Sequence, residues 1–162
     1  MEKLTMSRAF FPGAMLVSMI LSLPMPLVSP AAPPPQTKSL EGKVVPLAGL
    51  LEKFGSRLDP EAAPHWLALV TADGKIYPLI KDEGSRMFFS DPKLCNRPMR
   101  VTGRLFEDTH LLQVLSVNSI IHGELHEVYY WCEICSIRRN EKLPRCECCG
   151  GPMELREVPL NK

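Results

Sequence analysis

Four cysteines near the C-terminus form two Cys-x-x-Cys pairs, Cys132–Cys135 and Cys146–Cys149, separated by 10 residues. Two such pairs can bring four thiolates to one ion, and tetrahedral four-thiolate coordination suits zinc. Gly150 follows the second pair, where a tight turn around a metal often needs a left-handed backbone. The sequence therefore predicts one Zn²⁺ per chain in a structural site, with iron or another soft metal as alternatives. A metal-handling site and a redox dithiol pair are the other interpretations. The predicted ligands are Cys132, Cys135, Cys146 and Cys149.

The chain has six cysteines, so two lie outside this set. An even number also permits disulfides, which form readily among closely spaced cysteines in an oxidising compartment. Cys148 is interpreted as a spare thiol, a competing ligand or a resolving thiol. Cys95 lies far away in the sequence and is predicted to be a small buried hydrophobe. His122 and His126 have a ligand spacing for a helix, but Gly123 between them disfavours a helix, and we interpret both as surface residues.

The N-terminal segment bears on the compartment of the protein. Its positive residues Lys3 and Arg8 precede an uninterrupted apolar stretch, residues 13–23, and small residues follow around Ala31. This order predicts a signal peptide over residues 1–31 and an exported protein, periplasmic or extracellular, without membrane contact after cleavage. An uncleaved membrane anchor is the alternative, although the stretch is short for a bilayer span and prolines follow it.

Removal of that segment balances the charge of the chain. The 19 basic and 18 acidic residues become 17 of each, because Glu2, Lys3 and Arg8 are lost. A neutral protein has no overall electrostatic attraction for nucleic acid or anionic membranes, which disfavours both as partners. We expect an unknown protein or small-molecule partner instead. The sequence has no nucleophile-elbow, phosphate-loop or HExxH motif, and we predict that the protein is not an enzyme.

The middle of the chain alternates between apolar and polar residues, as is typical of short β-strands. Asp73-Gly74 predicts a hairpin turn between the second and third strands. Short helical segments are expected after the first strand and between the third and fourth. The proline-rich residues 32–37 are predicted to be an extended linker before the folded part. The expected strands are residues 40–47, 66–71, 75–80, 98–106 and 111–121.

Five short strands with a small helical segment between the third and fourth match the sequence layout of an OB-fold barrel. Residues 101–105 and 112–117 resemble the last two strands of OB-fold domains. Gly103 would let the fourth strand bend as the barrel closes. The resemblance implies a five-stranded barrel over residues 38–122. OB-folds often bind nucleic acid or oligosaccharide, so single-stranded nucleic-acid binding remains a function hypothesis.

Residues 123–162 contain few large apolar side chains, so a metal, disulfides or packing on the barrel must support them. Residues 130–135, the 10-residue spacer and residues 146–155 resemble the short heavy-metal-binding domain of exported metal-efflux proteins and copper-type ATPases. Zinc ribbons and rubredoxin-like knuckles have a similar pattern. The heavy-metal family carries His where this chain has Cys135, and the resulting all-thiolate set favours zinc or another soft ion.

These patterns together predict a mostly β protein in two parts, an OB-like barrel and a zinc-ribbon-like metal-binding segment over residues 123–162. The first function hypothesis is an exported, non-enzymatic protein in which structural zinc staples the ribbon beside a barrel that serves as a binding or interaction module. A heavy-metal or thiol-redox carrier is the second hypothesis. A single-stranded nucleic-acid-binding protein is the third.

Overall fold

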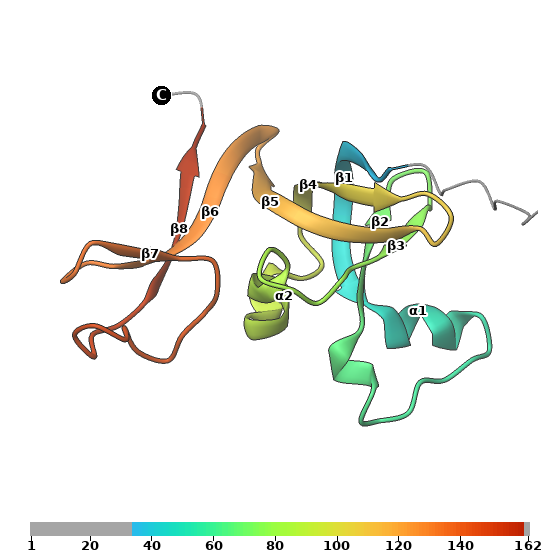
Figure 1. The fold of residues 1–162 in the computed structure, drawn as a ribbon, viewed down its shortest axis with the longest axis horizontal. Helices are drawn as coiled ribbons and strands as arrows, with labels where there is room; N and C mark the ends of the chain where they lie inside the picture. The colour runs from blue at the N-terminus through green and yellow to red at the C-terminus, as the bar shows by residue number, and fades with distance from the viewer. Residues whose placement is uncertain (1–33, 161–162) are drawn as a thin grey trace, which may run out of the picture. The chain divides into compact units, whose positions relative to one another are not determined.

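The protein is mostly β, and a computed structural model describes residues 34–160 (Figure 1). The predicted signal peptide and the start of the predicted linker lie outside the described residues. No helix in the described part of the chain is long and apolar enough to cross a membrane. In chain order the elements are β1 (Gln36–Pro46), α1 (Leu47–Lys53), the 3-10 helix η1 (Ala63–His65), β2 (Leu67–Thr71), β3 (Ile76–Pro78), α2 (Arg86–Ser90), the 3-10 helix η2 (Pro92–Leu94), β4 (Pro98–Phe106), β5 (Leu111–Ile121), β6 (Glu124–Cys132), β7 (Ile137–Arg139) and β8 (Glu154–Pro159).

The first five strands correspond to the five expected from the sequence. β4 and β5 have the predicted bounds, whereas β2 and β3 are shorter than predicted. β1 begins at Gln36, inside the predicted linker, because Gln36 and Thr37 pair with Leu105 and Arg104 of β4. The predicted hairpin turn joins β2 to β3, and Gly74 has the left-handed backbone (φ +80°) that this turn requires.

The strands form an open antiparallel sheet in the order β3-β2-β1-β4-β5-β6-β7, with β8 paired to β6, and not a closed barrel. β3 stops at Pro78, which has no N–H to donate to a further ladder. Beyond it, a single parallel bridge joins Leu79 to Leu112 of β5, and the Ile80 N–H donates to the Leu112 carbonyl at 3.0 Å. The expectation of a closed five-stranded barrel is thus corrected to an open sheet whose third and fifth strands meet at one bridge.

One face of these strands is buried, following the predicted alternation. Met99, Val101, Gly103 and Leu105 of β4 are buried, while the residues between them are more exposed. The β4–β5 ladder has a bulge opposite Thr102 and Gly103, with Leu115 of β5 as the extra residue. Here the backbone of β5 approaches so closely that a Cβ on Gly103 would overlap the Gln113 carbonyl oxygen. The core side chains are Val44, Leu67, Leu69, Tyr77, Leu79, Met87, Phe88, Leu94, Met99, Val101, Leu105, Leu112, Val114, Val117, Val128 and Tyr130.

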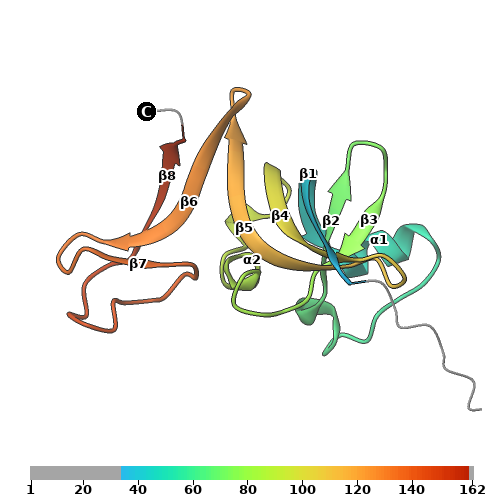
Figure 2. The ribbon, with the colours of Figure 1, turned by 45° about the horizontal axis from the view of Figure 1, so that its top comes forward.

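The C-terminal part shares both a ladder and a core with the first part. The predicted boundary between residues 122 and 123 falls in the turn from β5 to β6, and Asn118–Ile121 pair with Glu124–Glu127 across it. β6 then continues away from β5 and pairs with β7 and β8 (Figure 2). Val128 and Tyr130 of β6 belong to the main core cluster. Packing on the first part therefore supports β6 and β8. The short strand β7 was not predicted from the sequence.

A buried carboxylate joins the two parts. The Tyr130 hydroxyl of β6 donates a hydrogen bond of 2.9 Å to Asp91, which precedes η2. The Lys93 backbone N–H also donates to Asp91, and the Lys142 ammonium lies 3.5 Å away. Burial raises the pKa of Asp91, but these hydrogen bonds and the Lys142 charge outweigh it, so the pKa lies below its usual value. The ionised form of Asp91 is therefore the one that the fold stabilises.

Tyr130→Phe is expected to lower the free energy of unfolding by about 1–2 kcal/mol at neutral pH, because a buried carboxylate loses a hydrogen bond. The pKa of Asp91 is lowered only in the folded state. The difference in unfolding free energy between wild type and variant is therefore largest above about pH 4, and it shrinks as the pH falls through the folded pKa of Asp91. Urea unfolding measures it. Tyr129→Phe is the matched control, because the Tyr129 ring packs against Trp131 on the opposite face of β6. Equal losses in both variants would contradict the role of the Asp91 bond.

Candidate metal centre

The first Cys-x-x-Cys pair lies in the turn between β6 and β7. Cys132 is the last residue of β6 and pairs with Ile137, the first residue of β7. Cys135 lies in the turn between them, and Ser136 after it has a left-handed backbone with φ +52°. We call residues 132–135 the first knuckle. Its hairpin is closed by strand pairing, which places both thiols at the end of the ribbon.

The second pair, residues 146–149, forms a tight turn that we call the second knuckle. The Gly150 N–H donates to the Cys146 carbonyl at 2.8 Å, and the Cys146 N–H donates to the Gly151 carbonyl at 2.8 Å. Gly150 has φ +73°, a conformation that favours glycine, as predicted from its position after the last cysteine. These two backbone bonds turn Cys146 and Cys149 toward the first knuckle.

The structure brings all four predicted cysteines together. The sulfur atoms of Cys132, Cys135, Cys146 and Cys149 all lie within 4.8 Å of one another, and those of Cys132 and Cys149 are 3.5 Å apart. Zn–S bonds of about 2.3 Å in a tetrahedron require sulfurs about 3.8 Å apart, so this set fits a single ion after small adjustments. Four thiolates, without a carboxylate or a histidine, form a donor set for a soft or borderline ion.

In each knuckle, the first cysteine is less exposed than the second. Cys132 and Cys146, the first cysteine of each knuckle, are buried. Cys135 is half-buried and Cys149 is exposed. An ion at this centre would thus have one side against the protein interior and one side facing solvent.

Backbone N–H groups and neighbouring thiols set the acidity of the cluster. The N–H groups of Cys149 and Cys148 lower the pKa of Cys146 to about 7. The N–H of Cys135 lowers the pKa of Cys132, but burial and the thiols of Cys149 and Cys146 outweigh it and leave that pKa raised. Hydrogen bonds with the thiols of Cys149 and Cys148 raise the pKa of Cys135 above its usual value. The thiols of Cys132 and Cys135 therefore carry protons that a bound ion would displace.

Gly151 also contributes to the site, although the sequence did not identify it as a site residue. Its N–H donates to the Cys149 sulfur at 3.4 Å, and its carbonyl accepts from the Cys146 N–H. A Cβ at this position would lie 2.7 Å from Ile134 Cδ1 and 3.2 Å from the Cys149 sulfur. A glycine two residues after the last Cys of a metal knuckle was the available signal, but the pattern alone does not show what the backbone touches.

Gly151→Ala is expected to weaken metal affinity about tenfold, because the added methyl must displace the Cys149 sulfur from the other ligands. Competition with a zinc chelator of known affinity measures the change. Pro152→Ala is the control, since Pro152 is exposed and outside the cluster. An unchanged affinity in Gly151→Ala would contradict a tightly fitted second knuckle.

The remaining candidate residues lie outside the four-sulfur cluster. Cys95 is half-buried against the core, and its thiol donates to the Phe88 carbonyl, in line with its predicted packing role. Met153 also packs against the core. His122 lies in the turn between β5 and β6 with φ +51°, and among the described residues it belongs to no cluster of ligands with His126. All six cysteines are free thiols.

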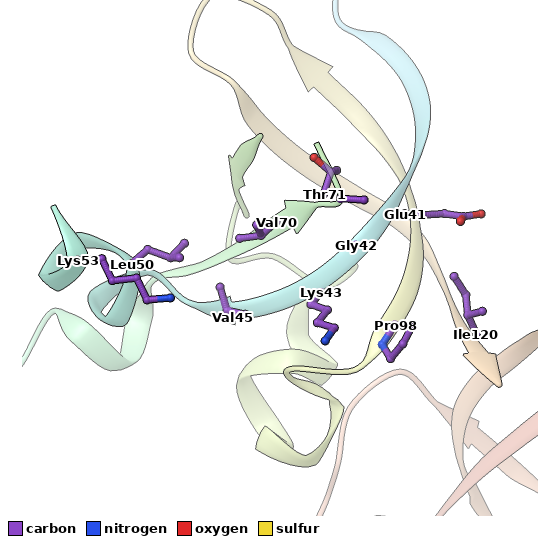
Figure 3. A pocket seen from close by; sticks show the side chains of 11 residues that line it. Glu41, Gly42, Lys43, Val45, Leu50, Lys53, Val70, Thr71, Pro98 and Ile120 are labelled. Carbon is purple, nitrogen blue, oxygen red and sulfur yellow. The ribbon is translucent and has the colours of Figure 1, made fainter. Parts of the chain in front are cut away.

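A groove of about 440 Å³ lies on β1 and β2, lined by other residues than the cysteines (Figure 3). Its wall includes Val45, Leu50 and Val70, and Val45 lies on the face of β1 opposite the buried Val44. The volume falls within the range of small-molecule sites, about 300–1,000 Å³. Glu41 is the single carboxylate of its lining, so the groove gathers no set of catalytic or metal-ligating groups.

Comparison of the chain with protein families, curated proteins and solved structures finds no match. The four-cysteine cluster and the mostly β sheet therefore carry the functional argument by themselves.

Proposed function

We propose that this is an exported, non-enzymatic metal-binding protein, in which one Zn²⁺ staples a C-terminal ribbon beside an interaction module built on the open β-sheet. The observation that carries the proposal is the convergence of four cysteine sulfurs within 4.8 Å of one another. The cysteines come from two turns with 10 residues between them, so their convergence is a property of the fold and not of one local sequence.

Zinc is the proposed ion because a four-thiolate tetrahedron is its common structural site. Iron binds the same set in rubredoxin-like centres and is the alternative. Zinc would displace the thiol protons, and its charge would stabilise four thiolates that otherwise repel one another. In this role the ion keeps its oxidation state and does not act on a substrate.

The need for a staple follows from the packing of the ribbon. β6 and β8 rest on the main core through Val128, Tyr130 and Leu155. The knuckles and β7 have no comparable apolar support: Ile134 is 70% exposed, and β7 has only three residues. A segment this short and polar is held by a metal or by crosslinks rather than by a hydrophobic core.

Elemental analysis of the protein, purified without chelator, tests this proposal when free thiols are counted on the same sample. We expect one zinc per chain and thiols that react only after chelation. A protein without metal and with few free thiols would have disulfides in its tail and would overturn the proposal. N-terminal sequencing of the exported form tests the export: we expect the mature chain to begin at Ala32, after the small residues that suit a cleavage site.

We propose further that β1–β5 form an OB-like module whose sheet stays open apart from one bridge. The strand order β3-β2-β1-β4-β5, the helix α2 between β3 and β4, and the bridge from Leu79 to Leu112 support this arrangement. Backbone amide exchange tests it at one atom. The Ile80 N–H should exchange slowly if its bond to the Leu112 carbonyl links the end of β3 to β5, and exchange at the rate of an exposed loop would contradict this link.

A further inference from the structure

The groove on β1 and β2 has apolar walls that come from three elements. Val45 of β1, Val70 of β2 and Leu50 of α1 all line it, and each of them is half-buried (Figure 3). Val70 is the cross-strand partner of Lys43, and Lys43 and Val45 are two residues apart on β1. Val45, Val70 and Lys43 therefore project from one face of the two strands, opposite the face of the main core.

The helix beside this groove has an apolar sequence but no buried residue. Leu47, Leu50 and Leu51 are half-buried, and Phe54 at the end of the helix is 73% exposed. A helix of seven residues depends on the packing of its apolar side chains for stability. The apolar surface between α1 and the strands is thus available for contact with a ligand.

Two lysines give this apolar groove a positive charge. Lys43 of β1 and Lys53 of α1 line it, and Figure 3 shows them on either side of Val45. Among residues 34–160, neither ammonium has a carboxylate within ion-pair distance. Glu41 also lines the groove, but it accepts a hydrogen bond of 2.9 Å from Arg100 Nε and is thus already paired. The groove therefore combines apolar walls with two unpaired positive charges.

We propose that the groove binds an amphiphilic anion of the fatty-acid class, with its alkyl chain against Val45, Val70 and Leu50 and its carboxylate at Lys43 and Lys53. The volume of about 440 Å³ is that of a site for one small molecule. An alkyl chain is stabilised by leaving water, and the two ammonium groups complement a carboxylate.

A head group with a single negative charge suits the groove best, because Glu41 in the lining repels the second charge of a phosphate. The inference rests on the part of the proposed function that makes the open sheet an interaction module, and it names the ligand class of that module. It does not depend on the metal, since none of the residues that line the groove is a cysteine.

The first test is a titration of the metal-loaded protein with decanoate below its micelle concentration, followed by amide NMR spectra. We expect saturable shifts at the amides around Val45, Val70 and Leu50 and no shifts at the knuckles. Octanoate should bind about tenfold more weakly than decanoate, because its chain is two methylenes shorter. Shifts that do not saturate, or that lie outside the groove, would overturn the inference.

The second test removes the positive charges of the groove. The double variant Lys43→Gln, Lys53→Gln should bind decanoate about tenfold more weakly and bind neutral octanol as wild type does, because only the anion interacts with the ammonium groups. Lys93→Gln is the matched control, since Lys93 is also exposed and does not line the groove. An unchanged affinity of the double variant for decanoate would overturn the inference.

Elemental analysis and sedimentation on the same sample separate this inference from the metal proposal. A monomer that holds one zinc and binds no decanoate would overturn the inference and leave the metal proposal standing. A dimer that binds no decanoate would have a second copy of the chain over the groove, and it would also overturn the inference. Specific decanoate binding by a protein without metal would support the inference and overturn the metal proposal.

Discussion

Chelation of the metal from the reduced protein is expected to unfold the two knuckles and β7 while β1–β5 stay folded. Residues 132–151 depend on the four sulfurs for their position, because Ile134 is exposed and Ile137 and Leu143 are only half-buried. Structural zinc contributes about 10–16 kcal/mol of binding free energy, which exceeds what the few contacts of these turns supply. We therefore expect amide protection in residues 132–151 to fall about 100-fold or more, a change of ~3 kcal/mol.

The first part of β6 should respond differently from its end. Asn118–Ile121 of β5 hold Glu124–Glu127 in a ladder that does not involve the metal, and Tyr130 is bonded to buried Asp91. Hydrogen exchange followed by mass spectrometry, with and without chelator, separates these segments within one sample. Cys132→Ser should reproduce the chelated state without chelator, and Cys95→Ser, outside the cluster, should not. Unchanged protection of the knuckles after metal removal would contradict a stapling role.

Gly103→Val is expected to destabilise the sheet of the first part by about 3 kcal/mol. A side chain at this position meets the Gln113 carbonyl oxygen of β5 and lies 2.9 Å from Leu112 Cδ1, so the two strands must separate or shift. β4 and β5 are central strands of the sheet, and both contribute to the core. The loss should appear as a lower urea midpoint in the unfolding of the metal-loaded protein.

The matched control for this variant is Gly49→Ala in α1. A Cβ at Gly49 meets no atom within 4 Å, and alanine favours a helix over glycine by about 1 kcal/mol. Gly49→Ala should therefore leave stability unchanged or raise it. If Gly103→Val were as stable as wild type, the close approach of β4 and β5 at the bulge would be wrong.

Local sequence patterns were sufficient to predict the strands in which apolar and polar residues alternate clearly, and to predict the candidate ligands. The alternation from Met99 to Leu105 predicted the bounds and the buried face of β4, because side chains on a strand point to opposite faces in turn. A hairpin turn at Asp73-Gly74 was predicted, because this dipeptide favours a turn in which the glycine takes a left-handed backbone. Gly74 has that backbone, but the central residues of the turn are Ala72 and Asp73, since the Gly74 N–H donates to the Thr71 carbonyl. The cysteine spacing predicted the metal cluster, because each knuckle is a single turn whose geometry depends on four or five residues.

Features that depend on contacts between distant segments were decided by the tertiary structure. The sequence predicted a closed barrel, but β5 runs on to pair with β6 and Pro78 ends β3, so the sheet remains open. The bond between Tyr130 and Asp91 joins residues 39 apart, and no local pattern indicates it.

The amino-acid sequence by itself determined the number of early strands, the buried face of β4 and the four candidate ligands. All of these follow from backbone periodicity and turn geometry within a few residues. Only the tertiary structure decided which cysteines are buried and that a side chain at Gly151 would crowd the Cys149 sulfur. The physical reason is that burial and close approach depend on how separate segments pack, and spacing along a chain does not specify that packing.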